Sequence, residues 1–137
     1  MSDELFVSDE MAAAEFDSWC AANEIDLDDV REEAKRLVPA CREVVLRELK
    51  KGFVTIDGEN ISYKIHYKQS GNFCGTELKF SAPTVRFSLA MDKEEGSVAK
   101  SIAGASCLTG QDVGLFRKLA LKDFGVCDAI VGLFAIA

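Results

Sequence analysis

His66 is the only histidine in this chain of 137 residues, and histidine is the residue type most often used to transfer protons near neutral pH. In that role it could act as a general base, provided that a nucleophile lay within its reach. The alternating pattern of its segment places His66 on a polar face with Ser62, Lys64 and Lys68, and no Ser or Cys is visibly paired with it. We therefore interpret His66 as a surface residue rather than a catalytic one.

Five cysteines lie at least 20 residues apart and form no C-x-x-C pair: Cys20, Cys41, Cys74, Cys107 and Cys127. With a single histidine, the chain has too few grouped ligands for a zinc site. The odd number of cysteines and the lack of a secretion signal indicate reduced thiols, and we expect these side chains to serve as small core residues. The glycine-containing stretches "GASCLTG" and "GVCDAIVG" match neither the P-loop nor the dinucleotide-binding pattern, so we expect no cofactor and no metal.

Carboxylates are concentrated at the start of the chain. Residues 1–34 hold twelve Asp or Glu and one Arg, a net charge of −11, so the total of −7 leaves +4 on the other 103 residues. This acidic head argues against non-specific binding of nucleic acid, which requires clustered Lys and Arg. The spacing of a calcium loop is absent, and an acidic first helical turn needs no other explanation than the helix dipole. We find no catalytic constellation and predict that the protein is not an enzyme.

Two helical regions are predicted before residue 52. In the first, over 9–22, Ser8 is the N-cap and Phe16, Trp19 and Cys20 share one face. A second helical stripe is predicted to begin at Asp26, with Ile25 and Val30 placed as a hydrophobic staple. Pro39 interrupts this stripe, which predicts a kink or two abutting helices, and Gly52 marks its end.

The hydrophobic period then changes to two. Apolar residues alternate around an Asp57–Gly58 turn, with Ile61, Tyr63, Ile65 and Tyr67 on one face, which predicts a β-hairpin. A third strand is predicted over 76–82, and residues 83–92 show no clear pattern.

The last third of the chain returns to helical spacing. A helix is predicted over 94–108, broken by Gly110, followed by a short helix to Lys118 that Thr109 and Asp112 would begin. A final helix over 121–135 contains Gly125 and Gly132, which suggests close packing or looseness until a partner arrives. This region is so rich in apolar side chains that we expect it to fill the core and also to contact another protein.

Together these patterns predict one α+β domain over 1–137. Residues 1–8 are expected to be disordered, 9–51 helical, 53–82 a small three-stranded antiparallel sheet, and 92–137 a helical group. No signal peptide or membrane span is visible, because the apolar tail "AIVGLFAIA" is about half the length that a span needs. We expect a cytosolic protein with no membrane partner.

The stretch "CLTGQDVGLFRKLALKDFGVCDAIVGLF" resembles the C-terminal signature of tail assembly chaperones of long-tailed phages and prophages. The shared pattern is an "LTG" turn, a short helix, a Leu-x-Leu-x-Asp step and a helix ending in Val and Phe. Its positions here are Leu108, Thr109, Gly110, Leu119, Leu121, Asp123, Val131 and Phe134. The strand in "GTELKFSAPT" and the hairpin are also similar, so the resemblance covers roughly 50–135. Ala120 stands where relatives often carry a polar cap, which leaves Asp123 to cap the last helix.

The resemblance implies a protein that acts by binding. Such chaperones hold the long, apolar, helical tape measure protein in the host cytoplasm and help to recruit the tail tube protein; a homo-oligomer is compatible with this role. The candidate partner-binding residues are Leu115, Phe116, Leu119, Phe124, Val131 and Phe134. Two alternatives stay open: an acidic phage inhibitor that mimics nucleic acid through the carboxylates of residues 3–33, and a structural component of the tail or baseplate.

Overall fold

The computed structural model describes residues 8–136 and has an α+β fold, as the sequence predicts. The helices are α1 (Asp9–Ala22), α2 (Glu32–Lys35), α3 (Val38–Lys51), α4 (Val85–Asp92), α5 (Ser97–Thr109), α6 (Val113–Arg117) and α7 (Leu121–Ile136). The strands are β1 (Val54–Asp57), β2 (Asn60–Lys64) and β3 (Glu77–Phe80), and a 3-10 segment, η2, spans Lys68–Phe73. The prediction of disorder over 1–8 falls outside the described residues except at Ser8.

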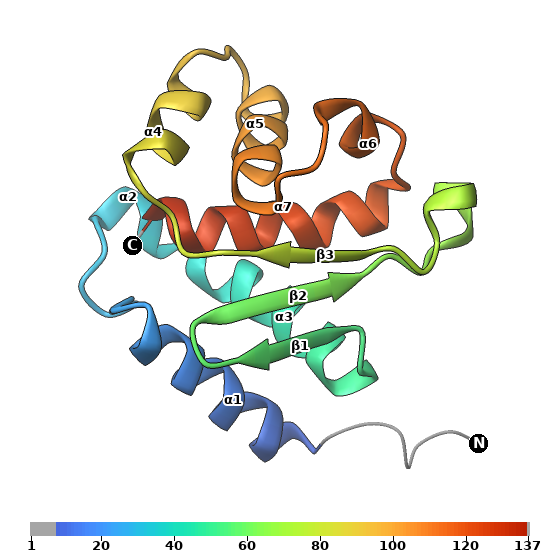
Figure 1. Cartoon of the computed structure of the whole chain (residues 1–137). Coiled ribbons are helices and arrows are strands. Elements are labelled where there is room, and N and C mark those ends of the chain that lie inside the picture. Colours follow the sequence, from blue (N-terminus) through green and yellow to red (C-terminus); the bar gives the residue numbers. More distant parts are fainter. Residues whose placement is uncertain (1–7, 137) are drawn as a thin grey trace.

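The three strands form an antiparallel meander in the order β1-β2-β3. Asp57 pairs with Asn60 across the hairpin, and Gly58 in the turn has the positive φ of 63° that favours glycine. Helices α3 and α7 lie behind this sheet, while α4, α5 and α6 gather above β3 and α1 lies below β1 (Figure 1). The predicted hairpin and third strand are therefore confirmed, with the sheet covered by helices on one face.

Helix α1 begins and ends where the sequence predicts. The Ser8 side chain accepts the N–H of Met11 at 3.2 Å, and Asn23 is the C-cap. Phe16, Trp19 and Cys20 are all buried on one face. A good cap and an amphipathic stripe in the same segment are enough to define this helix.

The predicted helix start at Asp26 is wrong. The Asp26 carboxylate instead accepts the N–H of Asp28 at 3.0 Å, a local turn that competes with helix formation. The long helix α3 begins only at Val38, and Pro39 lies in its first turn, where the missing N–H costs nothing. Pro39 therefore starts a helix rather than kinking one, and of the two predicted outcomes the abutting helices are confirmed, since α2 ends at Lys35 and α3 begins at Val38. The predicted end at Gly52 is confirmed by its left-handed φ of 85°.

Helix α4 was not predicted. Phe87 is its one fully buried side chain, and Met91, one turn later, is only partly buried. A helix of eight residues with a single buried apolar residue has almost no periodic signal. It forms because it packs on α5, where Lys100 donates to the Met91 carbonyl at the end of α4 (3.2 Å).

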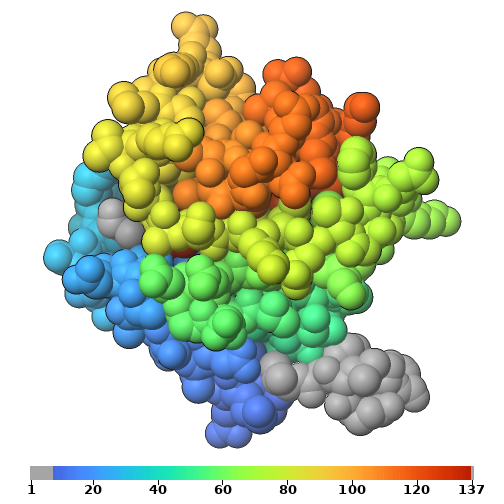
Figure 2. Space-filling model, in the orientation of Figure 1, coloured from blue at the N-terminus to red at the C-terminus, as the bar shows by residue number. Residues whose placement is uncertain are grey.

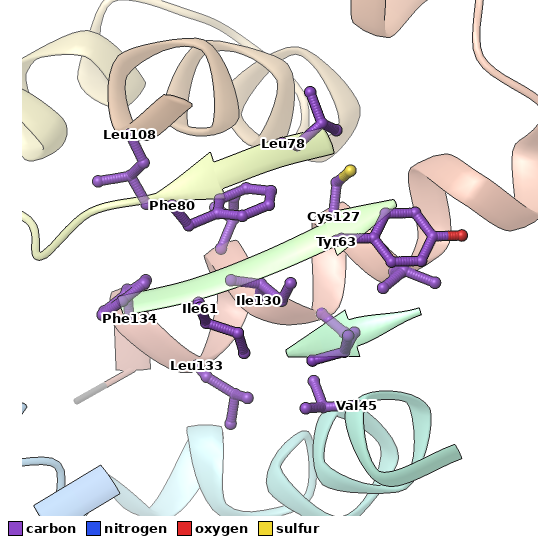
Figure 3. Packing of buried hydrophobic residues seen from close by; sticks show 14 of the residues in the cluster. Val45, Ile61, Tyr63, Leu78, Phe80, Leu108, Cys127, Ile130, Leu133 and Phe134 are labelled. Atoms are coloured by element: carbon purple, nitrogen blue, oxygen red, sulfur yellow. The ribbon is translucent and has the colours of Figure 1, made fainter. Parts of the chain in front are cut away.

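Helix α7 is the central element of the core. Its buried residues point toward the sheet, α3 and α5, and Figure 3 shows Ile130 beneath β2 and Leu133 on the side of α3. Ile130 and Leu133 are completely inaccessible to solvent, as are Val126 and Cys127. A helix that is apolar nearly all round is thus explained by elements packed around it.

Candidate functional site

His66 is not the surface histidine that the sequence predicts. Its side chain is only 17% exposed, and Nε2 lies 2.9 Å from Oε1 of Glu48, a fully buried residue of α3. The imidazole stacks on Phe53 with 3.6 Å between ring centroids. Glu48 also accepts from Arg47 Nε at 3.0 Å, so its carboxylate has a partner on each oxygen. The alternating pattern could not reveal this pair, because Glu48 belongs to a different element.

A second buried carboxylate, Asp123, lies in the first turn of α7 and is completely inaccessible. One oxygen accepts the Tyr63 hydroxyl at 2.6 Å and the His66 N–H at 3.1 Å. The other accepts the Ser70 hydroxyl at 2.5 Å and the Tyr67 N–H at 3.2 Å. We call Asp123, Tyr63 and Ser70, with these two backbone N–H groups, the Asp123 network.

The Asp123 network joins two segments that are far apart in the sequence, residues 63–70 and the start of α7. Ser70 Oγ, besides donating to Asp123, accepts the N–H of Ala120 at 2.8 Å and so satisfies a free donor at the start of α7. Burial, followed by the hydrogen bond to the Asp123 carboxylate, raises the pKa of Tyr63 well above its ordinary value. Tyr63 therefore stays protonated and continues to donate. The hydroxyl and carboxylate groups of the network thus all have hydrogen-bond partners. We interpret the network as a structural feature that holds α7 in place.

The role of Asp123 differs from the helix cap that the resemblance implies. Capping of Ala120 comes from Ser70, a residue of η2 that the sequence analysis did not single out. The Thr109–Asp112 start of the short helix is partly confirmed. Asp112 is the N-cap of α6 and accepts from Gly114 at 3.0 Å, whereas Thr109 is the last residue of α5 and donates to Ala105.

Three of the six predicted partner-binding residues belong to the core and offer no outer surface: Phe116, Val131 and Phe134 are each less than 7% exposed. Phe134 packs edge-on against Trp19 with 5.2 Å between ring centroids. The other three, Leu115, Leu119 and Phe124, are partly buried and pack against the same core. The expectation that the final helix carries an apolar outer face is therefore not met, because α3, α5 and the sheet occupy its apolar faces.

The cysteines are free, and Cys20 and Cys127 are buried as expected. Burial raises the pKa of Cys20 to about 11, which makes its thiol a poor nucleophile at neutral pH. Cys41 and Cys107 are partly buried, but Cys74 is exposed, so the prediction of a core role is wrong for Cys74. Its sulfur lies 3.2 Å from the Tyr67 carbonyl.

The surface feature best suited to binding is a trough along α5, bordered by α4 and α6. A hollow of about 520 Å³ lies between α4, α5 and the start of α6, and another of about 390 Å³ lies between α5 and α6. Both are lined by Glu94, Ala103 and Val113, so they are continuous. Figure 2 shows α4 in yellow beside α5 and α6 in orange at the top of the molecule. We use "trough" for these two hollows together.

The trough has a mixed lining, more polar between α4 and α5 and more apolar between α5 and α6, and a basic margin. Leu89 of α4 and Val98 of α5 are 55% and 60% exposed, although both are large and apolar. Small residues of α5, including Ala99 and Ala103, also line the trough. The charged residues of the lining are Arg86, Lys93, Arg117 and Glu94.

The basic residues of the trough differ in their pairing from Lys50 and Arg47, which lie along α3. Within residues 8–136, Arg86, Lys93 and Arg117 make no ion pair. A second hollow, along α3, also has basic residues, but there Lys50 pairs with Asp9 at 3.1 Å and Arg47 pairs with Glu48. Arg42 of that flank lies over the Phe16 ring. The three cations of the trough are thus available to a partner, as are exposed lysines elsewhere such as Lys64, Lys68 and Lys79.

Across residues 8–136, no helix is long and apolar enough to cross a membrane, and no group of three His, Cys, Asp or Glu side chains is placed to hold a metal ion. Comparisons with models of protein families, with characterised proteins and with solved structures found no match to this chain.

Proposed function

We propose that this protein is a tail assembly chaperone of a long-tailed phage or prophage, which acts in the host cytoplasm by reversible binding of an apolar helical partner. The observation that carries the proposal is the trough: Leu89 and Val98 stay largely exposed on neighbouring helices. A protein of this size with a well-filled core gains nothing in stability from exposing them, and a groove that carries exposed apolar side chains can hold an amphipathic helix.

The resemblance to the chaperone signature adds support of a different kind. The stretch that carries it spans α5, α6 and α7, and most of its residues have structural roles. Gly110 ends α5 with a φ of 74°, and Asp123 connects α7 to the sheet through hydrogen bonds. The signature would then specify the scaffold that presents the trough. On this proposal the partners are the tape measure protein, held in the trough, and the tail tube protein, which later replaces the chaperone.

Co-expression with the long helical protein encoded downstream in the same gene cluster tests the proposal. We expect the soluble fraction of that protein to rise with this chain, and the Leu89→Glu/Val98→Glu variant to lose the effect while remaining folded. Leu37→Glu is the matched control, because Leu37 is 52% exposed and lies outside the trough. If the helical protein is equally soluble with and without this chain, the chaperone proposal is wrong.

An acidic inhibitor that mimics nucleic acid is the second candidate, favoured by one observation. Asp26, Asp28, Asp29, Glu32 and Glu33 are all exposed on a short segment before α3. Reversing their charge should abolish inhibition by a mimic but leave partner binding by a chaperone nearly unchanged. The third possibility is a structural tail or baseplate component. Its presence in mature virions would distinguish it from a chaperone, which would be absent from them.

A further inference from the structure

We infer that the trough selects an amphipathic helix whose apolar stripe is flanked by carboxylates, two of them spaced one heptad apart on one flank. The inference rests on the proposed function, because it describes the partner of the same surface. It goes beyond that function by specifying the chemistry of the partner.

The shape of the trough fits a helix rather than an extended strand. Several α5 residues that line it are small, including the partly exposed Ala99 and Ala103, so a partner backbone can approach closely there. Leu89 on the α4 side and Val98 on the α5 side supply larger apolar contacts. A helix with apolar residues at i, i+3, i+4 and i+7 presents an apolar stripe that can contact both side chains.

The charges of the trough determine which charged residues are favoured beside the apolar stripe of the partner helix. Arg86 in α4 and Lys93, the C-cap of α4, lie seven residues apart, two helical turns or about 10 Å along one wall. Arg117 lies at the other side, near the end of α6. A partner helix packed roughly parallel to α4 would bring residues one heptad apart opposite Arg86 and Lys93.

The balance of charge along the trough supports this assignment. Arg86, Lys93 and Arg117 have no ionic partner within residues 8–136, and Glu94 is the one acid among the lining residues. A basic flank on the partner would place like charges together, which disfavours that partner. The trough therefore discriminates between amphipathic helices by the sign of their flanking charge.

A designed peptide pair tests the inference with the full chain. The probe is a fluorescein-labelled helical peptide with a leucine stripe and glutamates one heptad apart; its twins carry lysines for glutamates, or serines for leucines. We expect fluorescence anisotropy to show that the acidic leucine peptide binds about tenfold more tightly than either twin. Its affinity should also fall as salt concentration rises.

Charge-reversed variants locate the binding. Arg86→Glu/Lys93→Glu/Arg117→Glu should weaken binding of the acidic peptide about tenfold and favour the lysine twin. Lys64→Glu/Lys68→Glu/Lys79→Glu changes the net charge equally at exposed positions away from the trough, and should have little effect. Thermal unfolding of both variants checks that they remain folded.

The inference is overturned if the acidic and basic peptides bind equally, if both triple variants weaken binding equally, or if none of the peptides binds. In each of these cases, solubilisation of the downstream helical protein would still support the chaperone role. Selective peptide binding without such solubilisation would instead leave the inference standing and refute the proposed function.

Discussion

Asp123 is the residue whose tertiary role differs most from its sequence context. In the sequence it is one more acid near a helix start, where it favours the positive end of the helix dipole. In the fold it is fully buried and accepts from four donors: the hydroxyls of Tyr63 and Ser70 and the N–H groups of His66 and Tyr67. Two of these are charge-assisted hydroxyl bonds of 2.6 and 2.5 Å, so the network is fully satisfied.

Asp123→Asn should destabilise the protein by about 2–4 kcal/mol, because one carboxylate oxygen becomes an NH₂ group that faces other donors. Urea unfolding followed by circular dichroism measures the loss. Asp112→Asn is the matched control: Asp112 is an exposed N-cap, and Asn caps helices as well as Asp does. Equal unfolding free energies for the two variants would show that the Asp123 network adds no stability.

The pair of Glu48 and His66 is a second case in which the sequence does not reveal that a carboxylate is buried and paired. Glu48 lies in a helix with a basic end, a place where the sequence offers no reason to bury a carboxylate. His66 Nε2 and Arg47 Nε, each about 3 Å away, compensate that burial. The pairing depends on the position of α3 behind the hairpin, and single-sequence spacing carries no information about it.

At the scale of elements, some helical glycines are tightly packed against neighbouring helices and others are not. A Cβ on Gly104 of α5 would lie 2.9 Å from Phe87 Cε1 and 3.0 Å from Val131 Cγ1, so this glycine lets α4 and α7 approach α5. A Cβ on Gly125 of α7 would meet nothing within 4 Å. The predicted close packing in α7 applies to Gly132, which lies near Cys41, and not to Gly125.

Gly104→Ala should therefore lower the free energy of unfolding by about 1 kcal/mol net, since overpacking outweighs the gain in helix propensity. Gly125→Ala, which makes the same chemical change without a clash, should raise it by up to about 1 kcal/mol. Chemical denaturation of both variants provides the comparison. Stabilisation by Gly104→Ala would contradict the tight contact between α4, α5 and α7.

Local signals define some elements well and others poorly. Ser8, the apolar face of α1 and the alternating hairpin each combine a turn or cap with a clear period, so these elements could be predicted. The segment after Asp26 has similar signals, but the acidic turn at Asp26–Asp28 takes the place of a helix start. Helix α4 is the reverse case, a helix that forms without a clear local signal. Its sequence shows little hydrophobic periodicity, and its contact with α5 stabilises it.

At the scale of the whole molecule, α7 connects the sheet to the helices. It packs on α3 and α5, and its buried side chains complete the core beneath β2 (Figure 3). The apolar C-terminus is thus needed for folding, and the surface available to a partner lies on α4, α5 and α6 instead. Activity lost through a change in α7 would therefore reflect unfolding.

Leu133→Ala tests this division. Leu133 is completely buried, and its truncation should cost about 2–5 kcal/mol through lost burial and a cavity. Leu121, at the start of the same helix, is 88% exposed, and Leu121→Ala should change stability by less than about 0.5 kcal/mol. Thermal unfolding distinguishes the two; a stable Leu133→Ala variant would mean that α7 is not a core helix.

The sequence by itself determined the fold class, the hairpin, the third strand, the first and last helices and the separation of an acidic head from a mildly basic body. Those features follow from period, caps and charge, which act between residues close in the chain. Only the tertiary structure decided that Asp123 and Glu48 are buried, that the apolar tail is core, and that Arg86, Lys93 and Arg117 border one trough. These depend on contacts between residues distant in sequence, whose placement arises when the helices pack around α7.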